Sequence, residues 1–597
     1  MSGILSTMKK FPKVFWVANT IEIFERIAWY GLFAVLALYL TNSTDEGALG
    51  FTQIQKGAMM GTVTAILYFL PIITGAVADR IGYRRMLLIA FVVYGSGLLI
   101  MGSVTQYVLV YAAFLMVALG AALFKPVISA TVAKTTDDET SSIGFGIFYM
   151  MVNIGGFVGP ILSSKLRDAL GWHIVFVMAA SAIAVNIILV TFFYKEPYRE
   201  KSIDNLGDTI KKTLINIFSA LKDLKLLLFL IIMIGFWTMF NQLFYTLPNF
   251  IDQWVDTKVM YDSIANISPA LASAIGTKEG IIAPEMFITL DAGFIIIFQI
   301  IISAIVMKLR PINGIITGII VTTIGIGVAF SQMNGFYIVL GIFIFSIGEM
   351  ASSPKFSEYV GKIAPRNKEA LYMGTSFLPV AAGNFLTGFL SGNVYQAWSD
   401  KASLLKIEVV NRGVEILDKG TLYTYMDNIK FVAHSMKMNI SGFTNYIWQN
   451  NNLTIIKGTE SQLDNIGVNY SKFSTLVSPK NYVQTIDQYI VANTPSEVVL
   501  PWVNHQSQFF KLVENEVSSQ GLFTPKLNTI ITQNDYIHMA EQKMNMSSVQ
   551  LTNYLWDTYH PEKIWMLFSA IGVATIIGLL LYDRFVLKGG KTVESEA

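Results

Sequence analysis

Long apolar segments recur along almost the whole chain and decide what it can fold into. A helix needs about 20 mostly apolar residues to cross the hydrocarbon core of a bilayer, and the sequence contains about twelve such segments. The first contains Glu22, Glu25 and Arg26 and is too long for a signal peptide, so we interpret it as a spanning helix. The predicted fold class is an all-α membrane protein with spans at 14–40, 54–78, 86–103, 107–133, 143–166, 172–194, 226–250, 286–307, 312–331, 336–360, 370–395 and 563–585.

The composition argues against other classes. Charged residues make up 14% of the 597-residue chain and hydrophobic residues 53%, whereas soluble proteins have about 25% charged residues. The formal net charge of +2 points to neither nucleic acid nor acidic substrates. The chain has no cysteine, which excludes disulfides and thiolate sites, and its five histidines lack metal-ligand spacing. We expect neither an enzyme nor a bound metal or organic cofactor.

Basic residues in the loops predict the orientation. With the N-terminus inside, the cytoplasmic segments hold about 23 Lys and Arg, against about five outside, Lys56 among them. Both termini are therefore expected in the cytoplasm, and the protein is expected to be a multi-pass component of a bacterial inner membrane.

Two long polar segments divide the chain into parts. The charged, amphipathic linker 196–225 separates an N-terminal six-helix half, 1–195, from the helices of 226–395. The Asn-rich segment 396–561 has enough aromatic and aliphatic residues for its own core, so we expect a folded periplasmic or extracellular domain without disulfides. The last helix and a cytoplasmic tail occupy 562–597.

Three ionisable residues of the first span form one group. An ionisable side chain at bilayer depth is costly unless it is paired or hydrated. Glu22, Glu25 and Arg26 have the helical spacing i, i+3, i+4, which places Arg26 beside both carboxylates. Such a triad can hold a proton when the ion pair opens. The alternative is a fixed ion pair that only anchors the helix.

Isolated charges also occur deep in later spans. Lys125 lies in the middle of the fourth span and requires a carboxylate from the protein or from a substrate. Asp291 and Glu349 are the acidic residues deep in the second half. A static buried bridge between Lys125 and one of them is the alternative to a binding site. Prolines within the spans are typical of helices that bend around a central cavity.

The segment 75–85, Gly-Ala-Val-Ala-Asp-Arg-Ile-Gly-Tyr-Arg-Arg, joins the second and third spans. It resembles the G-x-x-x-D-R-x-G-R-R loop of the major facilitator superfamily. The resemblance implies a twelve-helix fold of two halves, each built from inverted three-helix repeats. It also implies a cytoplasmic gate formed by Gly75, Asp79, Arg80 and Arg84.

Further segments resemble a narrower family. The run 22–31, Glu-Ile-Phe-Glu-Arg-Ile-Ala-Trp-Tyr-Gly, is similar to the first-helix signature of the proton-dependent oligopeptide transporter family. The runs 148–156, Phe-Tyr-Met-Met-Val-Asn-Ile-Gly-Gly, and 348–354, Gly-Glu-Met-Ala-Ser-Ser-Pro, are similar to its fifth- and tenth-helix signatures. The resemblance covers both halves but not 396–561.

The resemblance implies roles for individual residues. Glu22 and Glu25 would be proton-coupling carboxylates with Arg26 as their exchangeable partner. Arg26, Tyr30 and Lys125 would meet the carboxylate of a peptide. Glu349 and Asn153 would meet the amino terminus of the peptide, and Tyr68 would line the pocket. Glu349 would also take part in proton coupling.

The sequence departs from this family at four pocket positions. Phe33 stands where the family usually has Arg, and Trp29 replaces the first tyrosine of its Y-Y-G triplet. Asn241 replaces the seventh-helix acid that normally partners the fourth-helix lysine, and Asp291 replaces an eighth-helix asparagine. We therefore hypothesise that Asp291 has become the partner of Lys125, and we include both Asn241 and Asp291 among the substrate-binding residues.

The predicted function is proton-coupled import of di- and tripeptides or peptide-like molecules by alternating access. The proton gradient would supply the energy, and the lipid bilayer, protons and the solute would be the partners. One alternative is a transporter or exporter of a different small solute. Another is a non-transporting membrane platform whose segment 396–561 binds a protein partner.

Overall fold

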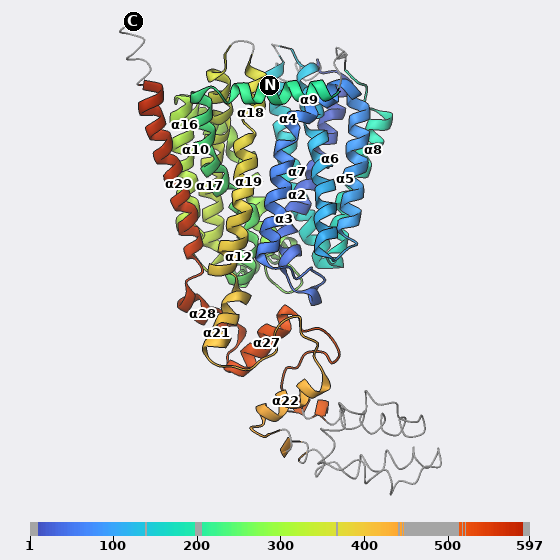
Figure 1. Ribbon diagram of the computed structural model, residues 1–597, viewed down its shortest axis with the longest axis vertical. Helices are drawn as coiled ribbons and strands as arrows, with labels where there is room; N and C mark the ends of the chain where they lie inside the picture. The colour runs from blue at the N-terminus through green and yellow to red at the C-terminus, as the bar shows by residue number, and fades with distance from the viewer. Residues whose placement is uncertain are drawn as a thin grey trace. The chain divides into compact units, whose positions relative to one another are not determined.

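The computed structural model describes residues 10–137, 140–197, 206–365, 368–439 and 521–588, with a few further residues between 442 and 519. The chain forms two compact units (Figure 1). The first, a helical bundle, comprises Met1–Leu404 and Leu555–Ala597, and the second comprises Leu405–Tyr554. The second unit lies wholly within the predicted inserted domain, 396–561.

The first half of the bundle follows the predicted spans closely. The second span is bent by 47° between Phe69 and Pro71, because proline cannot donate the backbone hydrogen bond that would continue the helix. Pro126 and Pro160 lie inside the fourth and fifth spans. The helices of this half are α2 (Lys13–Thr41), α3 (Gln53–Phe69), α4 (Pro71–Ile81), α5 (Tyr83–Met101), α6 (Tyr107–Lys134), α7 (Ser141–Leu170) and α8 (His173–Phe192).

The second half is more broken. Its helices are α10 (Leu224–Phe240), α11 (Gln242–Tyr245), α12 (Leu247–Trp254), α13 (Lys258–Ile267), α14 (Pro269–Ile275), α15 (Pro284–Val306), α16 (Pro311–Ile324), α17 (Gly335–Ile363), α18 (Glu369–Thr375), α19 (Leu378–Phe389), α20 (Tyr395–Trp398) and α29 (Lys563–Tyr582). π-Helical turns over Gly325–Ala329, Leu390–Val394 and Asp583–Lys588 extend α16, α19 and α29.

The number of uninterrupted spans is lower than predicted. Among the described residues, ten helices are long and apolar enough to cross a membrane, or eleven if the bent pair α3 and α4 is one span. The predicted span 370–395 is not a single helix: α18 ends at Thr375 and α19 begins at Leu378. Pro379, in the first turn of α19, favours a new helix start at this point.

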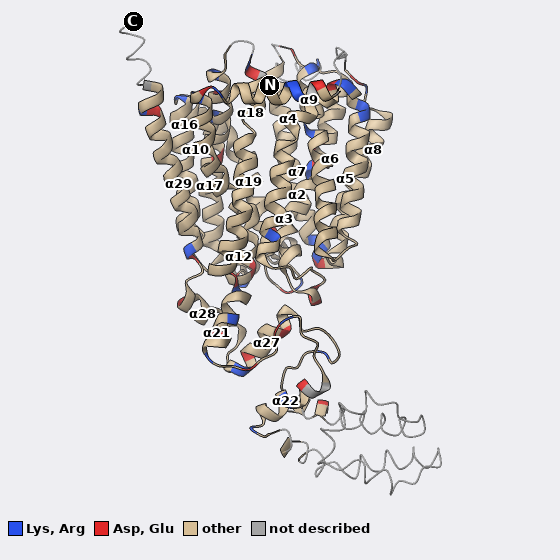
Figure 2. Cartoon of the chain, viewed as in Figure 1, with Lys and Arg blue, Asp and Glu red and all other residues tan. Residues whose placement is uncertain are grey.

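Charged residues gather at the two ends of the bundle, with few between them (Figure 2). We call the end where α2 begins and α29 finishes the terminus end. The insert end is the opposite one, where the chain leaves the bundle at Leu404 and returns at Leu555. The linker helix α9 (Leu206–Ala220) lies across the terminus end (Figure 1) and contacts α4 of the first half and α18 of the second.

The second unit has a small core of its own. Its helices include α22 (Tyr425–Ser435) and α27 (Gln533–Met544), and α21 (Lys401–Asn411) and α28 (Ser548–Tyr559) lead into and out of it. Thr424 and Thr532 begin α22 and α27 with capping boxes. Buried residues of this core include Tyr423, Ile429, Val432, Met539 and Leu551.

Candidate functional site

The predicted triad on α2 is formed and buried. Arg26 Nη2 lies 2.5 Å from Glu25 Oε2, and Arg26 Nε lies 3.3 Å from Glu22 Oε1. The glycine at position 155 of α7 makes this possible, because a Cβ there would lie 2.3 Å from the Cβ of Arg26. The Arg26 guanidinium also lies 5.7 Å from the centre of the Tyr30 ring. Glu22 Oε1, although it is ion-paired with Arg26, accepts no hydrogen bond among the described residues, and neither does Glu25 Oε1.

Lys125 belongs to the same group of charges. It is half-buried in α6, and its charged neighbours are Arg26, Glu22 and Glu25. In the described part of the chain no ion pair or hydrogen bond of Lys125 is formed. Two carboxylates and two cations therefore face one another on helices of the first half, with formal charges that cancel.

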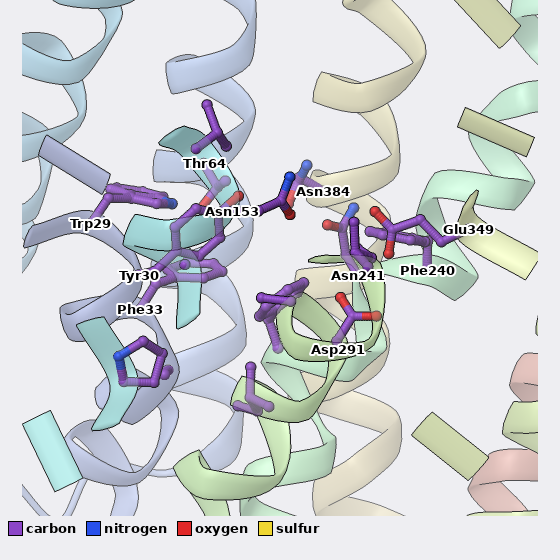
Figure 3. A pocket seen from close by; sticks show the side chains of 18 of the residues that line it. Trp29, Tyr30, Phe33, Thr64, Asn153, Phe240, Asn241, Asp291, Glu349 and Asn384 are labelled. Carbon is purple, nitrogen blue, oxygen red and sulfur yellow. The ribbon is translucent and has the colours of Figure 1, made fainter. Parts of the chain in front are cut away.

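A cavity of about 200 Å³ lies between the two halves (Figure 3). The first half contributes an aromatic wall that includes Trp29, Tyr30 and Phe33, and Tyr68 and Asn153 also line it. The second half contributes Asn241, Asp291 and Glu349, together with further apolar and polar side chains such as Phe240 and Asn384. Six predicted substrate-binding residues therefore line the cavity, namely Tyr30, Tyr68, Asn153, Asn241, Asp291 and Glu349.

Arg26 and Lys125 are absent from this lining among the described residues, although both were predicted to bind substrate. Phe33 stacks on Trp29, with ring centres 5.0 Å apart, at the position where the resemblance led us to expect an arginine. The part of the wall that was expected to be cationic is therefore aromatic.

The predicted partnership of Lys125 with Asp291 is not present in the structure. Ser346 Oγ donates to Asp291 Oδ1 at 2.6 Å, and Asp291 and Glu349 both line the cavity. Asp291 is thus satisfied by α17 within its own half, while Lys125 stays with the triad of α2. Ser346 was not singled out in the sequence, although it lies three residues before Glu349 and so on the same helix face.

The two asparagines of the lining are held by their own helices. Asn153 Nδ2 donates to the backbone oxygen of Tyr149 at 2.9 Å, and Asn241 Nδ2 donates to that of Trp237 at 2.7 Å. Each amide group therefore has a fixed direction. Asn241 supplies no charge where the family has an acid.

The halves meet tightly at the insert end. A Cβ at Gly57 of α3 would lie 2.2 Å from the backbone oxygen of Gly388 of α19, so the two backbones are in direct contact. Lys56, which the sequence placed in an outside loop, is instead fully buried in α3. Its Nζ donates to the backbone oxygen of Tyr245 at 2.9 Å and to Asn249 Oδ1 at 3.3 Å, both in the second half.

A second polar contact joins the halves at this end. Arg167 Nη2 of α7 lies 2.9 Å from Glu285 Oε1 of α15, and the Glu285 side chain is fully buried. Neither Lys56 nor Glu285 was predicted to be functional, because a single sequence does not show which helices of the two halves meet. Together with the glycine contact, these pairs close the cavity toward the insert end.

The predicted gate loop lies at the terminus end. Tyr83 Oη donates to Asp79 Oδ1 at 2.7 Å, and Arg84 Nη2 donates to the backbone oxygen of Thr191 at 2.5 Å. Arg80 is exposed at the end of α4, and a Cβ at Gly75 would lie 3.5 Å from the Cβ of Pro126 in α6. These contacts join α4, α5, α6 and α8 within the first half.

Known proteins share this arrangement. Residues 20–277 match the family model described as Major Facilitator Superfamily. A crystal structure of a POT family transporter in complex with 5-aminolevulinic acid superimposes with a TM-score of 0.55 and 20% identity, over 64% of this chain and 93% of that one. Over residues 20–277 the chain is similar to the major facilitator superfamily. A peptide transporter POT in complex with sulfate also superimposes on the chain, with a TM-score of 0.54 and 19% identity, over 67% of this chain and 95% of that one.

Relatives in sequence agree. The uncharacterized transporter YclF of Bacillus subtilis is 30% identical over 183 residues, which are 29% of this chain and 36% of that protein. The dipeptide and tripeptide permease A of Citrobacter koseri is 23% identical over 451 residues, 68% of this chain and 88% of that protein. These matches support the resemblance to the proton-dependent oligopeptide transporter family, and the long apolar helices of the described residues are those of a multi-pass membrane protein.

Proposed function

We propose that the protein imports di- and tripeptides or peptide-like molecules together with protons, by alternating access of the central cavity. The observation that carries this proposal is a cavity between two helical halves, with buried ionisable groups on both sides of it. Such groups are costly in an apolar bundle and can be replaced by leucine in a purely structural role. Their retention around a cavity fits binding and proton transfer.

The proton step uses the triad on α2. Protonation of Glu22 or Glu25 weakens its attraction to Arg26 and frees the guanidinium for another partner. Lys125 lies beside the triad, so a change in charge there also alters the field at Lys125. Inward orientation of both termini, with 405–554 outside, follows from the loop charges and belongs to the same proposal.

The conformation supports alternating access. The insert end is closed by the contact of Gly57 with Gly388 and by the Lys56 and Arg167 contacts. In the proposed orientation this is the outer side, so the cavity is in its outward-closed state. The outer seal must separate for uptake, and residues of both halves form it.

The test is a proton-flux assay on purified protein reconstituted into vesicles that contain a pH-sensitive dye. A mixture of dipeptides added outside should acidify the lumen. The Glu25→Gln variant should abolish the signal, whereas Glu279→Gln, a matched change outside the cavity lining, should not. Absence of flux with every peptide, in vesicles that retain correctly folded protein, would refute the proposal and favour a platform role for 405–554.

A further inference from the structure

The linker helix α9 lies outside the parts of the molecule that enclose the cavity or close the insert end. Its 15 residues, Leu206–Ala220, run across the terminus end (Figure 1). None of its described residues lines the cavity. It contacts α4 of the first half and α18 of the second. The amphipathic pattern that the sequence shows in this linker therefore needs an explanation of its own.

Two faces of α9 are accounted for by the bundle and by water. Ile217 and Ala220 are buried, each with 4% of its surface exposed, and form the face that packs on the bundle. Lys212, Asn216 and Ser219 have the spacing i, i+4, i+7 and are all exposed, so they form one polar face. A helix between a protein and solvent needs only these two faces.

A third face of α9 is apolar and yet exposed. Ile215 and Phe218 lie three residues apart, with 54% and 67% of their surfaces exposed. Lys211 lies one turn before this pair and Lys222 one turn after it, on the same face, and both are exposed. The backbone NH of Lys222 donates to the oxygen of Ser219 at 3.3 Å, so the helical turn extends that far.

The occupant that fits this third face is a bilayer with anionic headgroups. A helix with apolar side chains flanked by lysines lies in the membrane interface, with its apolar face at the boundary of headgroups and acyl chains. The terminus end is where the spanning helices reach that interface, and α9 lies across it (Figure 1). Lysine stems follow apolar surface while their ammonium groups reach polar partners. Among the described residues, the side chains of Lys211 and Lys222 have no ion-pair partner, so both charges are available to lipid phosphates.

We propose that the third face of α9 is a docking surface for anionic phospholipid at the terminus end. We call it the lipid face, and its residues are Lys211, Ile215, Phe218 and Lys222. Its two apolar side chains enter the boundary of headgroups and acyl chains, and its two ammonium groups bind phosphate. In the proposed orientation this is the cytoplasmic leaflet, whose negative surface potential attracts basic segments beside spanning helices. The inference goes beyond solute transport and does not depend on it.

The experiment places a fluorescent label on α9 of the full-length protein in lipid nanodiscs of phosphatidylcholine and phosphatidylglycerol. The chain has no cysteine, so Ile215→Cys and Asn216→Cys each carry a single bimane, on the lipid face and on the polar face. Nitroxide groups on the acyl chains should quench the bimane of Ile215→Cys strongly and that of Asn216→Cys weakly. Aqueous iodide should do the reverse. Phe218→Cys repeats the test on the lipid face if Ile215→Cys does not fold.

The headgroup is tested with the bimane of Ile215→Cys. Phosphatidylglycerol with a nitroxide chain should quench it at a lower mole fraction than phosphatidylcholine with the same chain. Lys211→Gln should reduce this preference about fivefold, which corresponds to the roughly 1 kcal/mol that one lysine contributes near an anionic membrane surface. Lys258→Gln, at an exposed lysine of α13, should leave the preference unchanged.

Three results would overturn the inference and leave the transport proposal standing. One is equal quenching of the two faces by lipid. Another is the absence of any preference for phosphatidylglycerol. The third is a bimane of Ile215→Cys that neither lipid nor iodide reaches, because this would show that protein rather than the bilayer covers the face.

Discussion

The glycine contact at the insert end offers the sharpest test of the transport cycle. A Cβ at Gly388 would lie 2.4 Å from the backbone oxygen of Gly57 and 2.5 Å from the Cα of Gly61. Real Cβ atoms do not approach backbone atoms so closely, so Gly388→Ala must push α19 away from α3. The added methyl group clashes with α3 only while the insert end is closed, because α3 and α19 belong to different halves.

The magnitude follows from the cost of overpacking. An extra carbon in a well-packed interface costs about 1–3 kcal/mol, and this cost applies to the closed insert end alone. A free-energy difference of that size shifts the ratio of the two conformations by about 5- to 150-fold. Replacement of glycine by alanine also stabilises an exposed helix by about 1 kcal/mol, but it does so in both conformations. Gly374→Ala shares that effect and meets nothing within 4 Å, so it is the matched control.

The chain contains no cysteine, which allows a clean accessibility assay. Val152→Cys places one thiol in the cavity wall, and a membrane-impermeant maleimide applied from the insert side reports opening. We expect Gly388→Ala to raise the labelling rate within the 5- to 150-fold range and Gly374→Ala to leave it unchanged. Equal rates in the two variants, with thermal unfolding that shows both are folded, would mean that this contact does not close the cavity.

Three further predictions concern buried charges. Glu25→Gln should remove solute accumulation driven by a pH gradient, while exchange of labelled for unlabelled solute continues. Vesicle assays with a pH gradient measure the first process, and assays without one measure the second. Arg26→Met should destabilise the protein by about 3–5 kcal/mol because it leaves two buried carboxylates without their cation; thermal unfolding measures this, and adding Glu22→Gln and Glu25→Gln should restore most of it. Lys56→Met should raise the rate at which the cavity thiol is labelled from the insert side. Its two acceptors in the second half would lose their donor, which destabilises the closed insert end by about 1–3 kcal/mol. The exposed Lys258→Met is the control, and an unchanged labelling rate in Lys56→Met would mean that Lys56 does not help to close this end.

Local patterns predicted those features that depend on one helix. The spacing of Glu22, Glu25 and Arg26 placed them on one face of α2, and the structure forms their ion pairs. The family signature at 148–156 included Gly155, whose lack of a side chain the structure explains by the contact with Arg26. The spans of the first half were found because hydrophobic length depends on composition alone.

Features that depend on two helices were not predicted. Nothing within α15 or α17 shows that Asp291 faces Glu349 rather than Lys125, because the choice of partner is decided by how the halves pack. Lys56 follows a polar loop in the sequence and is buried only because α3 meets the second half there. The break before Leu378 is a local feature that was missed for another reason, because average hydropathy does not register the helix start that Pro379 favours.

Charge balance connects the two groups of ionisable residues. In the first half, Glu22 and Glu25 are offset by Arg26 and Lys125, so that group has no net formal charge. In the second half, Asp291 and Glu349 are two acidic residues with no cation in the described lining. A zwitterion adds no net charge to the cavity, whereas a cation offsets the negative charge of these residues. Neutral contents are easier to enclose in an apolar bundle, since an unpaired charge raises the free energy of any state that excludes water. Closure of the cavity around its solute should therefore favour solutes that supply the positive charge this wall lacks.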